Sequence, residues 1–166
     1  MSIASTVSQT EIDAALERIA AGEADCYILR PGCEPLPGHG RGVRPLLQLL
    51  ENSPETLHGA VLADKIIGKA AAMIAVLGGV AAIHTLTASE SALAFLETAG
   101  IPAAARRTVP YIVNRTGDGM CPLEQTVREV EDPAAALPLL KATIARLMAA
   151  NAAAEAAKKA AEQPGG

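Results

Sequence analysis

The stretch that decides the fold is LHGAVLADKIIGKAAAMIAVLGGVAAIHTLTAS, residues 57–89. Its first part, residues 57–79, is rich in Ala, Ile, Leu and Met and ends in two glycines. This pattern predicts one long helix that stops at Gly78 and Gly79. The part after Lys69 is almost entirely apolar, so we expect that helix to be buried. Residues 80–89, VAAIHTLTAS, then predict a buried strand.

Helices and strands also alternate before this stretch. Residues 10–22 predict a helix with Thr10 as its N-cap. Residues 26–32 predict a short strand, and residues 33–42, which hold several glycines and prolines, predict a loop. Residues 44–52 predict another helix, because a proline in its first turn suits the start of a helix.

The alternation continues after residue 89. Residues 90–100 predict a helix that Ser89 caps, and residues 109–117 predict the next strand. Residues 122–132 and 132–148 predict two further helices. Strands that alternate with helices imply a parallel or mixed sheet with crossover connections.

The domain organisation follows from length and composition. A chain of 166 residues with 50% apolar residues can bury one core, so residues 1–148 are predicted to form a single domain. Pro138 is expected to bend or restart the last helix. Residues 149–166 are rich in Ala without an apolar stripe, so we expect a frayed or disordered extension.

Composition also excludes several classes of partner. With 2% aromatic residues and a net charge of −4, the chain lacks both the stacking platforms and the positive charge that nucleic-acid binding needs. The longest apolar run, residues 70–83, is too short to span a membrane, and the N-terminus lacks a targeting pattern. Three cysteines without a Cys-x-x-Cys pair are typical of reduced thiols. These features predict a cytoplasmic protein with no nucleic acid or membrane partner.

The most unusual stretch is GDGMCPLEQTV, residues 117–127. Pro122 suits the first position of a helix, so Cys121 is predicted at or near the N-cap. The helix dipole would stabilise a thiolate there, and a stabilised thiolate is a nucleophile. A second interpretation stays open, in which Cys121 is a small buried apolar side chain at a strand-to-helix junction.

Asp64 and Lys65 are predicted near the start of the apolar helix. Ligands of open α/β sheets bind where strands end and helices begin, so these two charges and Cys121 would form one polar site. The alternative is a solvated first turn in which Asp64 pairs with Lys69. Both interpretations remain open at the level of sequence.

Four segments together resemble a bacterial family, domain-of-unknown-function family 1893, whose members have the cytidine-deaminase-like fold. The segments are residues 40–50, 62–80, 109–125 and 132–144, within a match over residues 24–147. The resemblance implies a three-layer α/β/α fold with a mixed central sheet and helices on both faces. It also implies a site between the N-termini of two helices.

The resemblance allows a comparison with the zinc deaminases of that fold. Their zinc is held by a His-x-Glu helix and a Cys-x-x-Cys helix. In this comparison Leu62 and Asp64 take the positions of the His and the Glu, while Cys121 and Glu124 take those of the two cysteines. Leucine does not bind zinc, and the remaining residues are fewer than three usual ligands, so we expect no metal and no cofactor. A zinc-free transformylase and a sulfur-transferring accessory protein with this architecture imply reuse of the site without metal.

The first functional hypothesis is metal-free small-molecule chemistry or sulfur transfer. Cys121 is the predicted nucleophile or sulfur carrier, Asp64 the proton shuttle, and Lys65 the electrostatic partner. Glu124 is a candidate base on the same helix as Cys121. Four further residues are candidates for binding a substrate: Arg41, Arg44, Asn114 and Arg115.

Two other hypotheses belong to different classes. The first is a non-catalytic module that binds or senses a small ligand, and the second is a structural subunit of an oligomer. Whether the chain is an enzyme therefore stays open. A homo-oligomer is expected in all three cases.

Overall fold

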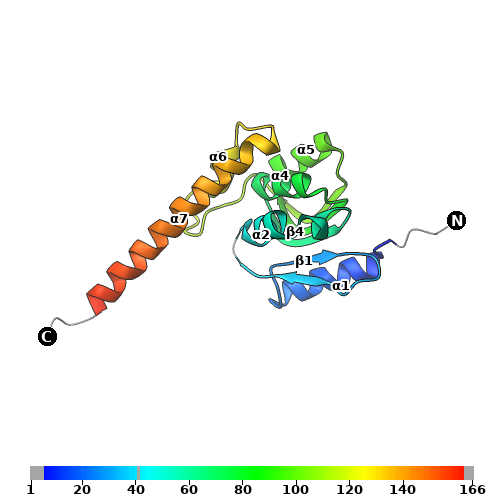
Figure 1. The fold of residues 1–166 in the computed structure, drawn as a ribbon, viewed down its shortest axis with the longest axis horizontal. Coiled ribbons are helices and arrows are strands. Elements are labelled where there is room, and N and C mark those ends of the chain that lie inside the picture. Colours follow the sequence, from blue (N-terminus) through cyan, green and yellow to red (C-terminus); the bar gives the residue numbers. More distant parts are fainter. Residues whose placement is uncertain (1–5, 41, 163–166) are drawn as a thin grey trace.

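The chain folds around a five-stranded mixed sheet (Figure 1). This computed structural model describes residues 6–40 and 42–162. The sheet has the order β2-β1-β3-β4-β5, in which β1 is antiparallel to β2 and β3, while β3, β4 and β5 are parallel. The strands are β1 (Cys26–Leu29), β2 (Leu36–Gly38), β3 (Val61–Ile67), β4 (Ala82–Ser89) and β5 (Ala103–Val109).

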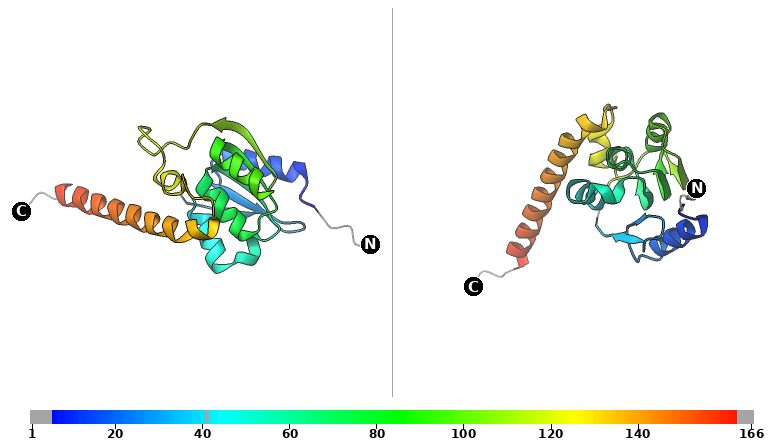
Figure 2. Two further views of the ribbon diagram at one scale, coloured as in Figure 1. Left: turned by 90° about the horizontal axis from the view of Figure 1, so that it is seen from above. Right: turned by 45° about the vertical axis from the view of Figure 1, so that its right-hand side comes forward.

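Helices flank both faces of the sheet. Helix α1 lies against one face, and α4 and α5 lie against the other, with the remaining helices packed around α4 (Figures 1 and 2). The helices are α1 (Gln9–Ala20), α2 (Arg44–Asn52), α3 (Pro54–Leu57), α4 (Lys69–Gly78), α5 (Glu90–Ala99), α6 (Pro122–Val127) and α7 (Pro133–Glu162).

The sheet separates two apolar clusters, because successive side chains of a strand point to opposite faces. The smaller cluster joins Ile12 and Leu16 of α1 to Tyr27 and Ala63 of the sheet. The larger cluster contains Leu62 and lies on the side of α4. Full burial of a large apolar side chain contributes roughly 1.5–3 kcal/mol, so the larger cluster dominates stability.

The prediction of one helix over residues 57–79 is wrong in its first half. Val61–Ile67 is strand β3, and only Lys69–Gly78 is helical. The first part of the strand lies between α1 and α4, so Leu62 and Ala63 are buried on opposite faces and the run is apolar there. Such a run does not distinguish a buried strand from a buried helix by periodicity. Asp64 and Lys65 therefore belong to a strand and do not lie at the start of a helix.

The predicted strand over residues 109–117 is also displaced. The fifth strand is Ala103–Val109, and after it only an isolated bridge joins Val113 to Met120. Pairing with β4 outweighs the weak strand preference of its Ala and Arg residues, and Pro110 has no N–H for a ladder. The predicted loop over residues 33–42 contains one additional strand, β2.

Several helix boundaries were predicted correctly. Pro45 lies in the first turn of α2, and Ser89 caps α5, which ends at Gly100 with a φ of +77°. The predicted N-cap of α1 is wrong, because Ser8 has that role and Thr10 does not. The Ser8 hydroxyl accepts a hydrogen bond from the Glu11 N–H, and the Glu11 carboxylate accepts one from the Ser8 N–H.

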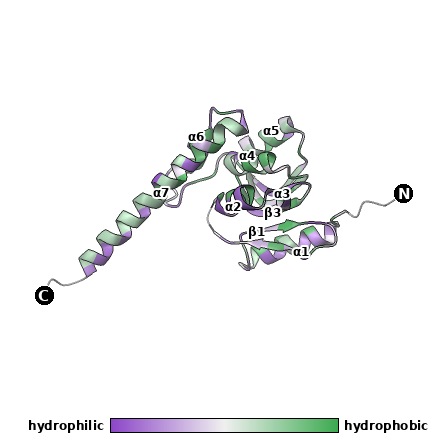
Figure 3. Ribbon diagram, viewed as in Figure 1, coloured by the Kyte–Doolittle hydropathy of each residue, from purple (hydrophilic) through white to green (hydrophobic). Residues whose placement is uncertain are grey.

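Helix α7 is the longest element and projects away from the sheet (Figure 1). It does not restart at Pro138, and its residues 149–162 are helical and exposed. Polar and apolar residues are interspersed along it (Figure 3). By length and composition alone, α7 is long and apolar enough to cross a membrane, and most of its apolar stretch is not buried in the protein. Core helices of soluble proteins meet the same criteria.

Candidate functional site

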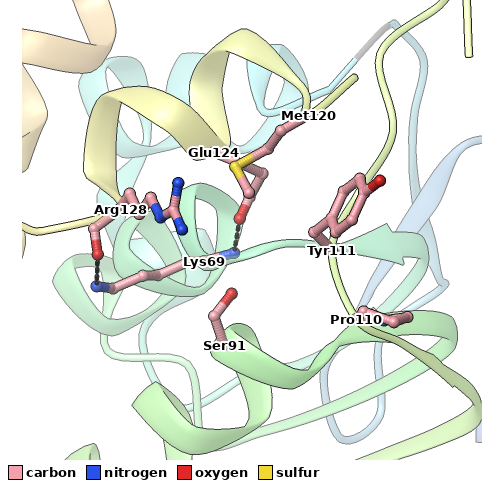
Figure 4. A pocket seen from close by; sticks show the side chains of 7 residues that line it. All are labelled: Lys69, Ser91, Pro110, Tyr111, Met120, Glu124 and Arg128. Carbon is pink, nitrogen blue, oxygen red and sulfur yellow. Dashed lines mark hydrogen bonds between the residues drawn. The ribbon is translucent and has the colours of Figure 1, made fainter. Parts of the chain in front are cut away.

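A pocket of about 260 Å³ lies at the carboxyl ends of the parallel strands. Each of these strands is followed by residues that reach it. Lys69 follows β3, Ser91 lies in the first turn of α5 after β4, and Pro110 and Tyr111 follow β5. The pocket is lined by Lys69, Ser91, Pro110, Tyr111, Met120, Glu124 and Arg128 (Figure 4). Open α/β sheets bind their ligands at this edge.

The Glu124 carboxylate caps the N-terminus of α4. Its Oε2 accepts a hydrogen bond of 2.9 Å from the Lys69 N–H, and its Oε1 accepts one of 3.2 Å from the Ala70 N–H (Figure 4). Gly68, the N-cap residue, has no side chain that could do this. Burial raises the pKa of Glu124, and the two amides and the Lys69 charge oppose that shift.

Gly68 is required by this contact for a steric reason. A Cβ at position 68 would overlap the Oε1 atom of Glu124. The backbone of Gly68 is extended, with φ of −99° and ψ of 178°, so other residues would adopt its conformation. The absence of a side chain is therefore what lets the carboxylate reach the helix end.

The Lys69 side chain joins α4 to the connection between α6 and α7. Its ammonium group donates hydrogen bonds of 3.2 Å to the Arg128 carbonyl and 3.1 Å to the Glu131 carboxylate. The Lys69 side chain is 7% exposed, whereas that of Glu131 is 81% exposed. A buried ammonium group thus has a charged partner and a backbone acceptor.

Asp64 lies at the middle of the sheet, outside the set of residues that line the pocket. It is opposite Cys26 on β1 and Thr85 on β4. Its Oδ1 accepts hydrogen bonds from the Lys65 and Ile66 amides, at 2.6 and 3.4 Å. Burial raises the pKa of Asp64 to about 7, and the charge of Asp25 adds to the shift.

Two of the predicted partners of Asp64 lie in different surroundings. Lys65 is exposed on β3. Cys121 is the N-cap of α6, as predicted, but its side chain makes no capping hydrogen bond and packs partly buried against the larger apolar cluster. Its amide donates to the Ile112 carbonyl at 2.8 Å, which fixes the start of α6.

The predicted substrate-binding residues do not line the pocket in the part of the chain that the structure describes. Arg44 is exposed at the start of α2, and Arg115 is exposed in the loop between β5 and α6. Asn114 is engaged within that loop, where it donates to Asp118 and accepts from Thr116. Arg41 lies outside the described residues.

Glu124 is thus the one predicted site residue that lines this pocket, among the residues described. Lys69, Ser91 and Arg128 were not predicted as site residues. A signal for the first was present, because Gly68-Lys69 follows the β-branched Ile66 and Ile67 and marks the change from strand to helix. Arg128 has no such signal, since it reaches the pocket only through the packing of α6 against α4.

The residues present do not fit a zinc ion. Leu62 and Asp64, which the comparison with deaminases placed on a helix, lie within strand β3. Glu124 uses both oxygens to cap α4. Within residues 6–40 and 42–162, no three His, Cys, Asp or Glu side chains lie close enough together to hold a metal ion.

Comparisons with known proteins give the family and the fold. No curated protein matches the chain. The structure is similar to the crystal structure of a DUF1893 family protein, TM1506, from Thermotoga maritima, with a TM-score of 0.71 and 21% sequence identity over 88% of this chain and 96% of that chain. A family model, TM1506, domain of unknown function DUF1893, matches residues 15–144. The chain therefore belongs to the DUF1893 family of unknown function.

Proposed function

We propose that the chain binds a small organic molecule in the pocket formed by Lys69, Ser91, Pro110, Tyr111, Met120, Glu124 and Arg128. The position of the pocket carries the proposal, since it lies where the three parallel strands β3, β4 and β5 end and where helices α4 and α5 begin. Backbone hydrogen bonds fix Glu124 and Lys69, so part of its wall is formed before a ligand enters.

A fragment panel tests this function. The panel contains neutral, cationic and anionic fragments. We expect at least one of them to shift the NMR signals of pocket residues. Ser91→Phe, which places a ring in the pocket, should abolish those shifts. Ala94→Phe, on an exposed position of the same helix, is the matched control and should leave them unchanged. The proposal is wrong if no fragment shifts a pocket signal, or if both variants bind like the wild type.

A second candidate is metal-free thiol chemistry or sulfur transfer centred on Cys121. The partly exposed position of Cys121 at the start of α6 favours it. In this candidate Asp64, whose pKa burial raises to about 7, would be the proton shuttle. Lys65 would act as an electrostatic partner from β3. This function requires the Cys121 thiolate to react faster than an ordinary exposed thiol.

Alkylation at several pH values tests the second candidate without any substitution. Peptide mass mapping separates the three thiols, and the exposed Cys33 serves as the reference. Cys26 should stay unmodified, because burial raises its pKa to about 12. If Cys121 reacts faster than Cys33 near pH 6 to 7, thiol chemistry is supported. Slower reaction of Cys121 than of Cys33 at every pH rejects it.

We also propose that the fold is of the cytidine-deaminase-like type. The mixed sheet with one antiparallel strand beside three parallel ones, helices on both faces, and a polar pocket between the ends of α4 and α6 support this assignment. The assignment concerns architecture, and the reaction does not follow from it.

A further inference from the structure

The charged side chains of the pocket differ in how many contacts they already make within the protein. The Lys69 ammonium group is bound by the Glu131 carboxylate and the Arg128 carbonyl. The Glu124 carboxylate is bound by two amides. Both side chains are therefore already engaged in contacts within the protein, which a ligand would have to share.

Arg128 is different. It is exposed, and within the described residues its guanidinium group forms no ion pair and no hydrogen bond. Its backbone is nevertheless fixed, since its amide donates to the Gln125 carbonyl and its own carbonyl accepts from Lys69. The side chain extends from this anchored backbone into the pocket (Figure 4). Within the described residues, no carboxylate lies within salt-bridge distance of its guanidinium group.

The opposite wall is apolar with two hydroxyl groups. Pro110, Tyr111 and Met120 come from the connection between β5 and α6, and the Tyr111 residue is 45% exposed (Figure 4). An aromatic ring and a thioether both pack well against a flat apolar body. Ser91 and Tyr111 add neutral hydroxyl groups that donate or accept hydrogen bonds.

From these features we infer that the pocket takes a small planar organic monoanion, such as an aromatic or heteroaromatic carboxylate. This inference rests on the proposed function and names its ligand class. The planar body lies against Tyr111 and Met120, and the carboxylate lies against the Arg128 guanidinium, whose fork of N–H donors matches two carboxylate oxygens. The volume of about 260 Å³ is below the usual range of about 300–1,000 Å³ for drug-sized ligands, which limits the ligand to one or two rings.

The probes for this inference are benzoate and its neutral isostere benzamide, titrated into the full chain and followed by NMR. We expect benzoate to bind about tenfold more tightly than benzamide, with shifts at Ser91, Tyr111 and Met120. Arg128→Gln should reduce that preference to about twofold or less. Arg146→Gln removes another exposed arginine, on α7, and should leave the preference unchanged.

The outcomes separate this inference from the proposed function. Equal binding of both probes, or a preference that survives Arg128→Gln, overturns the monoanion as ligand class while the pocket remains a binding site. The same holds if neither probe binds but neutral or cationic fragments do. If no fragment of any charge binds, the proposed function fails, and the ligand class fails with it.

Discussion

The contact between Gly68 and Glu124 makes two residues far apart in the sequence depend on each other. Glu124→Ala leaves the Lys69 and Ala70 amides without their acceptor, and a buried unpaired donor costs roughly 1–3 kcal/mol. Gly68→Ala displaces the same carboxylate and should cost a similar amount. Both substitutions remove the same contact. The double variant should therefore lose less free energy of unfolding than the two single variants lose together. Urea denaturation of the four proteins measures this.

Gly119→Ala is the matched control for that experiment. Its φ is not positive, and a Cβ there would meet Asn114 at an ordinary distance of 3.6 Å. We expect little change in its free energy of unfolding. If Gly68→Ala is no less stable than Gly119→Ala, or if the double variant is strictly additive, Glu124 does not cap α4 in the way described.

The raised pKa of Asp64 predicts a pH dependence of the free energy of unfolding whose sign is unusual for a carboxyl group. Its ordinary pKa is 3.8, and burial raises the pKa in the folded protein to about 7. Between these two pH values the unfolded chain has released the proton while the folded protein retains it. The free energy of unfolding should therefore fall as pH rises from about 4 to about 7, by up to a few kcal/mol from this group.

Asp64→Asn isolates this effect. Its amide oxygen still accepts from the Lys65 and Ile66 amides, but the residue no longer ionises. We expect the variant to be more stable than the wild type at pH 8 and to lack this part of the decline. Glu129→Gln, on the exposed surface, should follow the wild-type curve. Parallel curves for wild type and Asp64→Asn would show that Asp64 ionises normally.

Among whole elements, those with local boundary signals were predictable. The helix at Glu90–Ala99 begins after a serine cap and ends at a glycine, and α2 has a proline in its first turn. The strand Ala82–Ser89 follows the Gly78-Gly79 stop of α4. In each case the residues that decide the boundary lie next to it in the sequence.

The elements that were not predictable depend on distant partners. β3 has helices on both faces, so its apolar residues fit a helical pattern equally well. β5 contains three Ala and two Arg residues, and its extended form depends on pairing with β4. The same limit applied to the site. Glu124 was predicted as a base, and its role as a cap depends on a contact across 55 positions of sequence.

At the scale of the molecule, α7 divides into a packed part and a projecting part. Ala136, Leu140 and Thr143 are buried, whereas all residues from 149 to 162 are exposed. Truncation after Met148 should therefore change the free energy of unfolding by less than about 0.5 kcal/mol. Urea denaturation measures this change, and far-ultraviolet circular dichroism should show the loss of helix.

Leu140→Ala is the contrasting variant, because Leu140 is 1% exposed and such a truncation typically costs about 2–5 kcal/mol. The domain boundary predicted at residue 148 is wrong if the shortened chain is as unstable as Leu140→Ala.

Self-association also stays a prediction. Analytical ultracentrifugation of the full and shortened chains measures it and shows whether the projecting part of α7 contributes.

The cap that Glu124 provides has a consequence for the order in which the molecule is made. Synthesis proceeds from the N-terminus, so the segment that becomes β1 to β4 is made before residue 124 is joined. Until then, a nascent α4 has two amides without their acceptor, and the wall of the pocket that Glu124 and Arg128 form does not exist. Helix α4 should therefore be less stable in ribosome-bound chains that end before residue 124 than in the complete protein. The binding site becomes complete only late in translation.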